Sequence, residues 1–220
     1  MAVLLLCGCG QKSETTAAAP AQAVTAPAAQ SGMARPVNTG VTPEQFGAKG
    51  DGIADDLQAL QAAMQQASAS GRPLELTAGA VYRFSSCLGL PSGLTIRGNG
   101  AVLLSDIQYP DLREDRVAVE LMKDSDGDRA HDVRLENVTF RAADSCQANY
   151  MLRVMLARNV EFVGCTFDCE PNEWGRCAAD LYGGNENIRF EGCVFRQMTS
   201  DASGGIWVRN WTDRVESRNI

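Results

Sequence analysis

The sequence predicts an all-β fold in which short parallel strands stack as successive coils, and three observations lead to this expectation. Charged residues recur 27, 28 and 27 residues apart, apolar residues flank them at fixed distances, and each repeat alternates apolar with polar positions. Alternation of this kind is typical of a strand with one buried face, and a period of this length is typical of solenoids. The charged column is Arg134, Glu161, Arg189 and Glu216; the inward columns are Val133, Val160, Ile188 and Val215, then Leu135, Phe162, Phe190 and Ser217, then Phe140, Phe167 and Phe195.

The charges in these columns favour the same register. Residues at equivalent points of neighbouring coils are adjacent, and the first column alternates arginine with glutamate. A second column, Arg141, Asp168 and Arg196, alternates in the same way. Each exposed pair contributes only about 0 to 1 kcal/mol, so these ladders select the register more than they stabilise the fold.

Residues 42–98 predict a cap at the N-terminal end of the coils. A glycine-rich run, FGAKGDG at 46–52, precedes Asp55 and Asp56. Asp55 with Gln58 fits a capping box, and Gly71 ends the expected helix. The apolar stripe of that helix consists of Leu57, Leu60, Met64 and Ala67. Strands are expected at 74–76, 81–84 and 94–98, and a cap of this kind would cover the first coil.

This order of glycine-rich turn, Asp-Asp pair, amphipathic helix and strands resembles the N-terminal cap of the pectate-lyase superfamily. That superfamily includes family 28 glycoside hydrolases, rhamnogalacturonase- and epimerase-like proteins and phage tailspikes. The resemblance covers residues 41–220 and implies a right-handed parallel β-helix (solenoid) with three short strands per coil, an N-terminal capping α-helix and a substrate cleft along one sheet. The same cap precedes hydrolases, lyases, epimerases and adhesins, so it does not identify a reaction.

Composition narrows the class of protein. The chain has 220 residues, of which 45% are hydrophobic, so it can bury a sizeable core. A net charge of -7 disfavours nucleic acid as a partner, because a phosphate-binding groove needs a basic footprint. No apolar stretch approaches the length that spans a bilayer. Nothing in the pattern indicates an oligomeric state.

Three segments follow from the sequence. Residues 1–9 resemble a bacterial lipoprotein signal in which Cys9 is lipidated, although no Lys or Arg precedes the apolar run; an uncleaved or mis-started hydrophobic tail is the alternative. Residues 10–40 lack apolar periodicity and are expected to form a disordered tether with a reach of roughly 30 Å. Residues 41–220 form the β-helix domain. The expected location is the bacterial cell envelope, with the protein lipid-anchored through Cys9 or periplasmic or extracellular.

Two groups of cysteines are distinguished. Cys165 and Cys193 occupy one inward column in adjacent coils, where buried thiols are favoured over a disulfide. Cys146, Cys169 and Cys177 lie between strands, where a bridge would form in an oxidising compartment, with the pairing left open.

A further strand in each coil carries the residue types that recognise sugars. Arginines pair with uronate carboxylates and aromatic rings stack on sugar faces, and the superfamily resemblance implies that this sheet carries the cleft. One predicted outward column is Arg153, Asp180 and Trp207, and the next is Met155, Tyr182 and Arg209. The substrate-binding candidates are Arg153, Tyr182, Trp207 and Arg209.

Two carboxylates at a suitable separation permit hydrolysis, one protonating the leaving oxygen and one activating water. Asp180 is the first catalytic candidate, Asp201 the second, and Glu173 the replacement for Asp201. The competing interpretation is that all three are solvated or ladder-paired carboxylates on the coil surface.

Several features depart from the polygalacturonase pattern. Its Asn-Thr-Asp-Gly strand would fall at 202–205, where no aspartate occurs, and no Gly-His-Gly motif is present. The family 28 mechanism is therefore not carried over, and His131, the sole histidine, is interpreted as a turn residue. Zinc is disfavoured because Cys-x-x-Cys pairs are lacking. Asp124, Asp126 and Asp128 offer oxygen ligands for calcium, with an ordinary acidic turn as the alternative.

These observations predict a carbohydrate-active protein that acts on an acidic, pectin-like polysaccharide as a hydrolase, lyase or epimerase. The alternative is a noncatalytic glycan-binding or adhesion module on the same scaffold. Ile220 is expected in the inward column of Cys193, so the last coil would be incomplete and further coils would follow in a longer protein.

Overall fold

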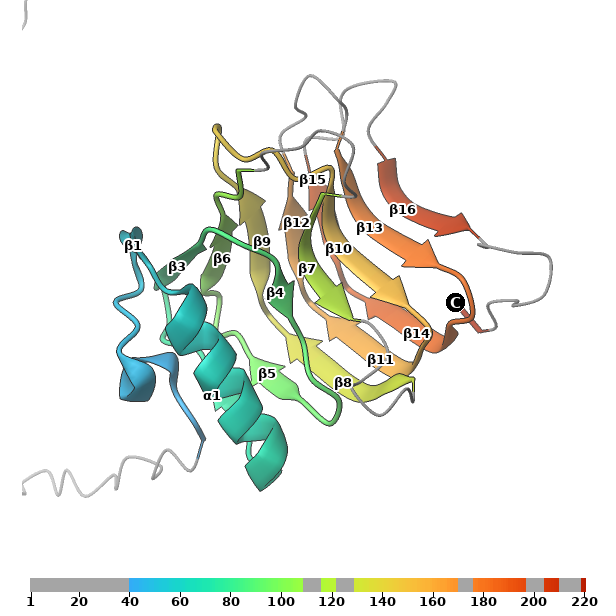
Figure 1. The fold of residues 1–220 in the computed structure, drawn as a ribbon. Coiled ribbons are helices and arrows are strands. Elements are labelled where there is room, and N and C mark those ends of the chain that lie inside the picture. Colours follow the sequence, from blue (N-terminus) through green and yellow to red (C-terminus); the bar gives the residue numbers. More distant parts are fainter. Residues whose placement is uncertain (1–39, 109–115, 122–128, 170–175, 197–203, 210–218) are drawn as a thin grey trace, which may run out of the picture. The chain divides into compact units, whose positions relative to one another are not determined.

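The computed structural model describes residues 40–108, 116–121, 129–169, 176–196, 204–209 and 219–220, which lie in one compact unit of the chain. They form a right-handed parallel β-helix, as the sequence predicted (Figure 1). Residues 1–39, which include the expected signal and almost all of the expected tether, lie outside the described residues.

Each coil contributes one strand to each of three parallel sheets. Sheet 1 contains β1 (Asp51–Asp55), β3 (Val81–Phe84), β6 (Val102–Ser105), β9 (Thr139–Ala142), β12 (Thr166–Asp168) and β15 (Val194–Arg196). Sheet 2 contains β4 (Leu88–Gly89), β7 (Val117–Leu121), β10 (Tyr150–Met155), β13 (Cys177–Tyr182) and β16 (Gly204–Arg209). Sheet 3 contains β2 (Leu74–Glu75), β5 (Thr95–Arg97), β8 (Ala130–Glu136), β11 (Ala157–Val163) and β14 (Glu186–Glu191).

The predicted columns are confirmed through the third repeat. Val160 pairs with Val133 on one side and Ile188 on the other, and Glu161 likewise lies between Arg134 and Arg189. Inside the coils, the ring of Phe167 stacks 4.9 Å from Phe140 and 5.0 Å from Phe195. Buried apolar contact and aromatic stacking therefore fix the register that the sequence periodicity indicated.

The fourth repeat was predicted in the wrong register. Asn219 lies over Asn187, because its Nδ2 donates to Asn187 Oδ1 at 2.8 Å, so this step is 32 residues long. Ile220 therefore follows Asn219 as Ile188 follows Asn187, and it does not belong to the column of Cys193. The step from β13 to β16 keeps the shorter period, so the additional residues lie between Arg209 and Asn219. The expected column members Val215, Glu216 and Ser217 lie outside the described residues.

A ladder of polar side chains, which the sequence analysis missed, runs along the first residues of the sheet 3 strands β8, β11 and β14 and continues to Asn219. Its members all adopt the left-handed conformation, with φ of 55°, 54°, 56° and 52°: Asp132, Asn159, Asn187 and Asn219. Each asparagine donates from Nδ2 to the side-chain oxygen of the preceding member, at 2.9, 3.0 and 2.8 Å. Asparagine and aspartate tolerate this conformation better than most residues, which accounts for their recurrence here.

The N-terminal cap consists of the 3₁₀ helix η1 (Pro43–Phe46) and α1 (Leu57–Ser70), which ends at Gly71 with φ of 63°. The predicted apolar stripe is confirmed, since Leu57, Leu60, Met64 and Ala67 are all buried. The helix packs against β2 and β4 at the N-terminal end of the coils (Figure 1).

The capping box expected from Asp55 and Gln58 is wrong, because the N-cap of α1 is Asp56. The Asp56 carboxylate instead accepts hydrogen bonds from the backbone N–H groups of Lys49 at 2.7 Å and Gly50 at 3.0 Å. Asp56 is buried, so the aspartate pair holds the glycine-rich turn against the start of the helix.

The cysteines of both groups are free thiols. Cys165 is buried and Cys193 half-buried in their inward column, as predicted. Cys146, Cys169 and Cys177 are also buried, and the bridge expected among them is not formed in this structure. Burial raises the pKa of the Cys169 thiol to about 12, so this thiol is protonated near neutral pH.

Candidate functional site

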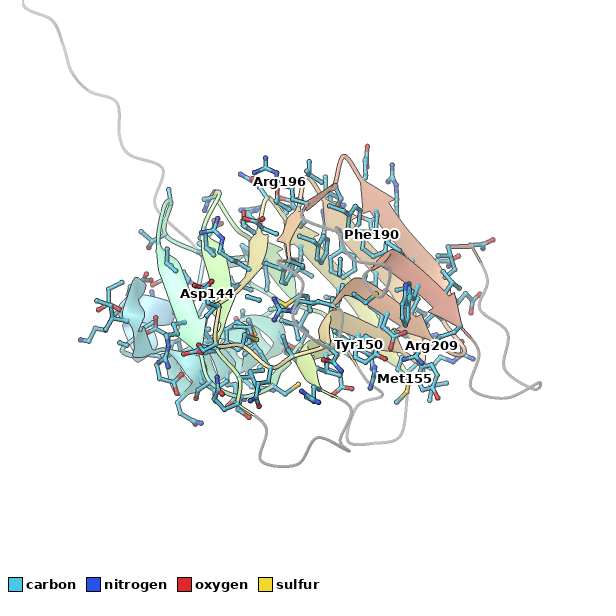
Figure 2. The ribbon with its side chains drawn as sticks, turned by 90° about the horizontal axis from the view of Figure 1, so that it is seen from above. Asp144, Tyr150, Met155, Phe190, Arg196 and Arg209 are labelled. Atoms are coloured by element: carbon cyan, nitrogen blue, oxygen red, sulfur yellow. The ribbon has the colours of Figure 1, made fainter. Side chains whose placement is uncertain are left out.

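The two columns expected to face a ligand lie side by side on the outer face of sheet 2. The register places Asp180 between Arg153 and Trp207. It also places Tyr182 between Met155 and Arg209. Strands β10, β13 and β16 thus bring together all four predicted substrate-binding residues and the first catalytic candidate. Figure 2 shows Arg209 of this group close to Tyr150 at the start of β10, with Met155 nearby.

Asp180 is the centre of this group. It is fully buried, and both of its carboxylate oxygens accept hydrogen bonds from guanidinium groups. Arg209 donates from Nε to Oδ1 and from Nη2 to Oδ2, each at 2.7 Å, and Arg153 donates from Nε to Oδ2 at 3.0 Å. Paired, charge-assisted bonds of this kind are strong and directional. The carboxylate is therefore a buried, ladder-paired group whose oxygens face arginines.

Three aromatic rings surround the guanidinium groups. Arg209 Cζ lies 4.6 Å from the ring centre of Tyr182, 5.3 Å from that of Tyr150 and 6.0 Å from Trp207. Arg153 Cζ lies 4.7 Å from Tyr150 and 5.6 Å from Tyr182. These distances are those of cation–π contacts. We call Tyr150, Arg153, Asp180, Tyr182, Trp207 and Arg209 the arginine–aromatic cluster.

The outermost members of the cluster are accessible to a ligand. Trp207 is 40% exposed and the Arg209 side chain 38% exposed, whereas Arg153 is only 5% exposed. The hydrogen bonds to Asp180 are the first cause that raises the pKa of Arg209, and Tyr150 adds to the rise. The cluster therefore presents a permanently charged guanidinium beside an exposed indole ring.

Tyr150 is a member that the sequence analysis missed. It pairs with Cys177, a position whose side chain is buried, so strand alternation alone predicts that Tyr150 faces inward. Its ring instead contacts both arginines and lies edge-on to Trp207, with centroids 6.4 Å apart. The available signal was its aromatic character at the start of a strand next to the predicted columns.

The charged column also extends one coil toward the N-terminus. Glu120 on β7 pairs with Arg153, so the column runs Glu120, Arg153, Asp180 and Trp207. The thiol of Cys87 lies 3.9 Å from Glu120 Oε2, and burial, with Glu120 as the second cause, raises its pKa to about 12. The spacing from Glu120 to Arg153 is longer than the usual period, so the regular repeat did not identify Glu120 as a member of this column.

The structure does not describe the other residues that were predicted to act in catalysis or to bind calcium. Asp201, Glu173 and the three aspartates Asp124, Asp126 and Asp128 lie outside the described residues, so their catalytic and calcium-binding roles stay predictions. His131, which was interpreted as a turn residue, lies instead within β8, and its Nδ1 lies 2.9 Å from Asp132 Oδ2. Within the described part of the chain, no three His, Cys, Asp or Glu side chains are grouped to hold a metal ion.

A cavity of about 830 Å³ lies elsewhere, over β8, β11 and β14 of sheet 3. Its lining residues are Asp132, Val133, Arg134, Asn159, Glu161, Asn187, Ile188, Arg189, Asn219 and Ile220. The charged groups in this lining pair with one another: Glu161 contacts Arg134, and it lies 3.9 Å from Arg189. This lining offers no aromatic surface among its described residues, so the candidate sugar site is the cluster on sheet 2.

The one α-helix among residues 40–108, α1, has 14 residues, and no helix in the described parts of the chain is long and apolar enough to cross a membrane.

Comparison with solved structures identifies similar folds. PfbA, a surface adhesin of Streptococcus pneumoniae, is 18% identical with a TM-score of 0.58, over 79% of this chain and 43% of that one. ORF18 of Geobacillus virus E2 is also 18% identical, with a TM-score of 0.54, over 78% of this chain and 40% of that one. This chain thus spans less than half the length of either, and at such identity the likeness shows the fold alone.

Comparison with curated protein sequences gives no match. A family model does match, over residues 41–210, which contain the cap, the coils and the whole arginine–aromatic cluster. The chain therefore belongs to the family described as rhamnogalacturonase A/epimerase, pectate lyase-like.

Proposed function

We propose that this chain is a carbohydrate-active β-helix protein that binds an acidic polysaccharide along the outer face of sheet 2 and acts on it by hydrolysis, elimination or epimerisation. Family membership supports the carbohydrate class. The residues of the cluster support the acidic character, because a guanidinium recognises a sugar carboxylate and indole and phenol rings pack on the apolar face of a sugar.

The observation that carries the proposal is the exposed Arg209 side chain beside the exposed Trp207 ring. The two residues lie on one strand, two positions apart, so their side chains project from the same face of the sheet. A uronate bound there would place its carboxylate on Arg209 and its ring over Trp207. Tyr182 and Tyr150 border the same surface.

Proton transfer in this proposal falls to carboxylates other than Asp180. Glu173 and Asp201 occur in the segments directly before β13 and β16 in the sequence, next to the strands that carry the cluster. Hydrolysis would need both of them, one as acid and one as base, whereas elimination would need one base beside the uronate carboxyl group. We keep both residues as catalytic candidates.

A noncatalytic glycan-binding module is the second candidate function. PfbA, a protein described as a surface adhesin, has the same fold. The fold by itself therefore does not imply catalysis. Under this alternative the cluster would bind acidic glycans with the same residues and release no product.

The test combines binding with product analysis on pectin, alginate and rhamnogalacturonan fragments. Arg209→Ala and Trp207→Ala are expected to weaken binding at least tenfold, about 1.4 kcal/mol. Arg196→Ala, an exposed arginine of sheet 1 that lies away from the cluster in Figure 2, is the matched control and should bind as the wild type does. Unsaturated products indicate elimination, new reducing ends alone indicate hydrolysis, and a changed uronate configuration without either indicates epimerisation. Binding with none of these changes indicates the adhesion module. Unchanged affinity in both cluster variants contradicts the proposal.

The same proposal includes attachment to the bacterial cell envelope through lipidated Cys9. Metabolic labelling with a fatty acid should mark the wild-type protein, and Cys9→Ser should remove the label and release the protein from the membrane fraction. A wild-type protein without label would overturn the anchor and leave the sugar site unaffected.

A further inference from the structure

Asp180 determines which edge of Arg209 a ligand can meet. A guanidinium carries five N–H donors in a fixed planar fork. The bonds from Nε to Oδ1 and from Nη2 to Oδ2 use one long edge of that fork. The two hydrogens of Nη1 and the second hydrogen of Nη2 stay outside this pair. One hydrogen of Nη1 and the second hydrogen of Nη2 form the end of the fork, which has the geometry for a second, end-on contact with a carboxylate.

Asp180 is itself held in place from the opposite side. Arg153, which is almost fully buried, donates from Nε to Oδ2, so the carboxylate is fixed between two guanidiniums. Tyr182 then packs 4.6 Å from Arg209 Cζ and restricts movement of the guanidinium plane. The buried Arg153 thus fixes the position of the buried Asp180, and Asp180 in turn fixes the orientation of the accessible Arg209.

These contacts are poorly suited to proton transfer by Asp180. Oδ2 already accepts bonds from Arg153 at 3.0 Å and Arg209 at 2.7 Å, and Oδ1 accepts a bond from Arg209 at 2.7 Å. The carboxylate is also fully buried, so it offers no surface to a ligand. The sequence predicted Asp180 as the first catalytic candidate, and the geometry points to a different role.

We propose that Asp180 is a positioning residue: it fixes Arg209 so that the end of the guanidinium fork faces the ligand and favours a carboxylate over an uncharged group. This inference rests on the proposed function, since it requires that Arg209 binds the sugar. A fixed donor pair loses less entropy when it binds than a freely rotating side chain does, so removal of the clamp weakens selective binding.

The test is the ratio of affinities for an oligogalacturonate and for its methyl ester, measured by calorimetry on the full chain. Asp180→Asn is expected to lower this ratio at least fivefold by weakening the acid form, with the methyl ester bound as before. Asp168→Asn is the control, because Asp168 also pairs with an arginine of the adjacent coil, Arg141 at 3.2 Å, but lies in sheet 1 and is less buried than Asp180. It should leave the ratio unchanged.

A purely structural role would weaken both ligands equally, and an unchanged ratio in Asp180→Asn would overturn the inference. A catalytic role would abolish turnover with both affinities intact, which would overturn it as well. If the single variant does not fold, the double variant Asp180→Asn with Arg153→Gln removes the unpaired buried charge and carries the same expectation. Failure of the proposed function is distinct, because Arg209→Ala would then bind the acid form as tightly as the wild type.

Discussion

The stack of phenylalanines inside the coils provides the sharpest quantitative test of the fold. Phe167 is fully buried, stacks on Phe140 and Phe195, and lies edge-on to Phe162 with centroids 6.3 Å apart. Removal of a buried phenylalanine side chain costs about 3 to 5 kcal/mol, and each stacked pair adds about 0.5 to 1.5 kcal/mol beyond burial. We therefore expect Phe167→Ala to lower the free energy of unfolding by about 4 to 8 kcal/mol.

Urea denaturation followed by circular dichroism measures this loss. The urea concentration at the midpoint of unfolding should fall, while the dependence of the unfolding free energy on urea concentration (the m-value) stays constant. In a domain of this size the melting temperature should fall by about 10 °C or more. Phe46→Ala is the control, because Phe46 is 39% exposed and its removal should cost less than about 1 kcal/mol. A loss below about 1 kcal/mol for Phe167→Ala would refute the stacked interior.

Three further expectations concern buried and titrating groups. Arg176 is buried and donates to the carbonyl oxygens of Ala148 at 3.0 Å and Cys146 at 2.8 Å. Arg176→Ala should therefore lower the free energy of unfolding, measured by urea denaturation, by about 2 to 3 kcal/mol. A loss below about 0.5 kcal/mol would contradict this expectation. Hydrogen bonds from Asn159 and then His131 hold the pKa of Asp132 below its usual value. The contribution of Asp132 to stability is therefore present above its unfolded pKa and lost as pH falls through its folded pKa. The melting temperature of Asp132→Asn should consequently depend less on pH than that of the wild type below about pH 4. An unchanged dependence would contradict the hydrogen bonds of Asp132 in the polar ladder. Burial raises the pKa of Cys169 to about 12, so at about pH 8 this thiol should resist iodoacetamide until the protein is unfolded, and mass spectrometry showing rapid native labelling would disprove its burial.

The coil architecture was predictable because its signals are periodic. Apolar side chains must return to the interior once per coil, so Val133, Val160 and Ile188 recur at a nearly constant spacing. The register of β10, β13 and β16 followed from the same step. Where the step lengthens, as between Asn187 and Asn219, the constant period led to Val215, Glu216 and Ser217 being assigned to the columns, which the register of Asn219 does not support.

Five members of the arginine–aromatic cluster were predictable from the strand columns, whereas Tyr150 and the geometry of the cluster were not. Alternation along a strand gives the face on which a side chain lies, and it correctly placed Asp180, Trp207 and Arg209 on one surface. It does not give the depth at which a side chain is covered. Asp180 lies on an outward column and is nevertheless buried, because neighbouring guanidiniums and rings enclose it. The turn of Tyr150 toward the arginines is likewise a result of packing between coils, which a single strand pattern does not contain.

The ladder of polar side chains at Asp132, Asn159, Asn187 and Asn219 was visible in the sequence but was not recognised. Its members occupy the position directly before an inward residue in successive coils, a spacing that is visible in the sequence. The sequence analysis followed apolar and charged columns and passed over it. A backbone conformation with positive φ at each rung is the physical reason for the residue type.

The most direct test of the sugar site is the indole N–H signal of Trp207 in an ¹⁵N-labelled sample, assigned by its absence in Trp207→Phe. We expect this signal to shift progressively as an oligogalacturonate is added, and the shift to be lost in Arg209→Ala. A ligand that binds while the Trp207 signal stays in place, with changes confined to the groups over β8, β11 and β14, would contradict the assignment of the site to sheet 2.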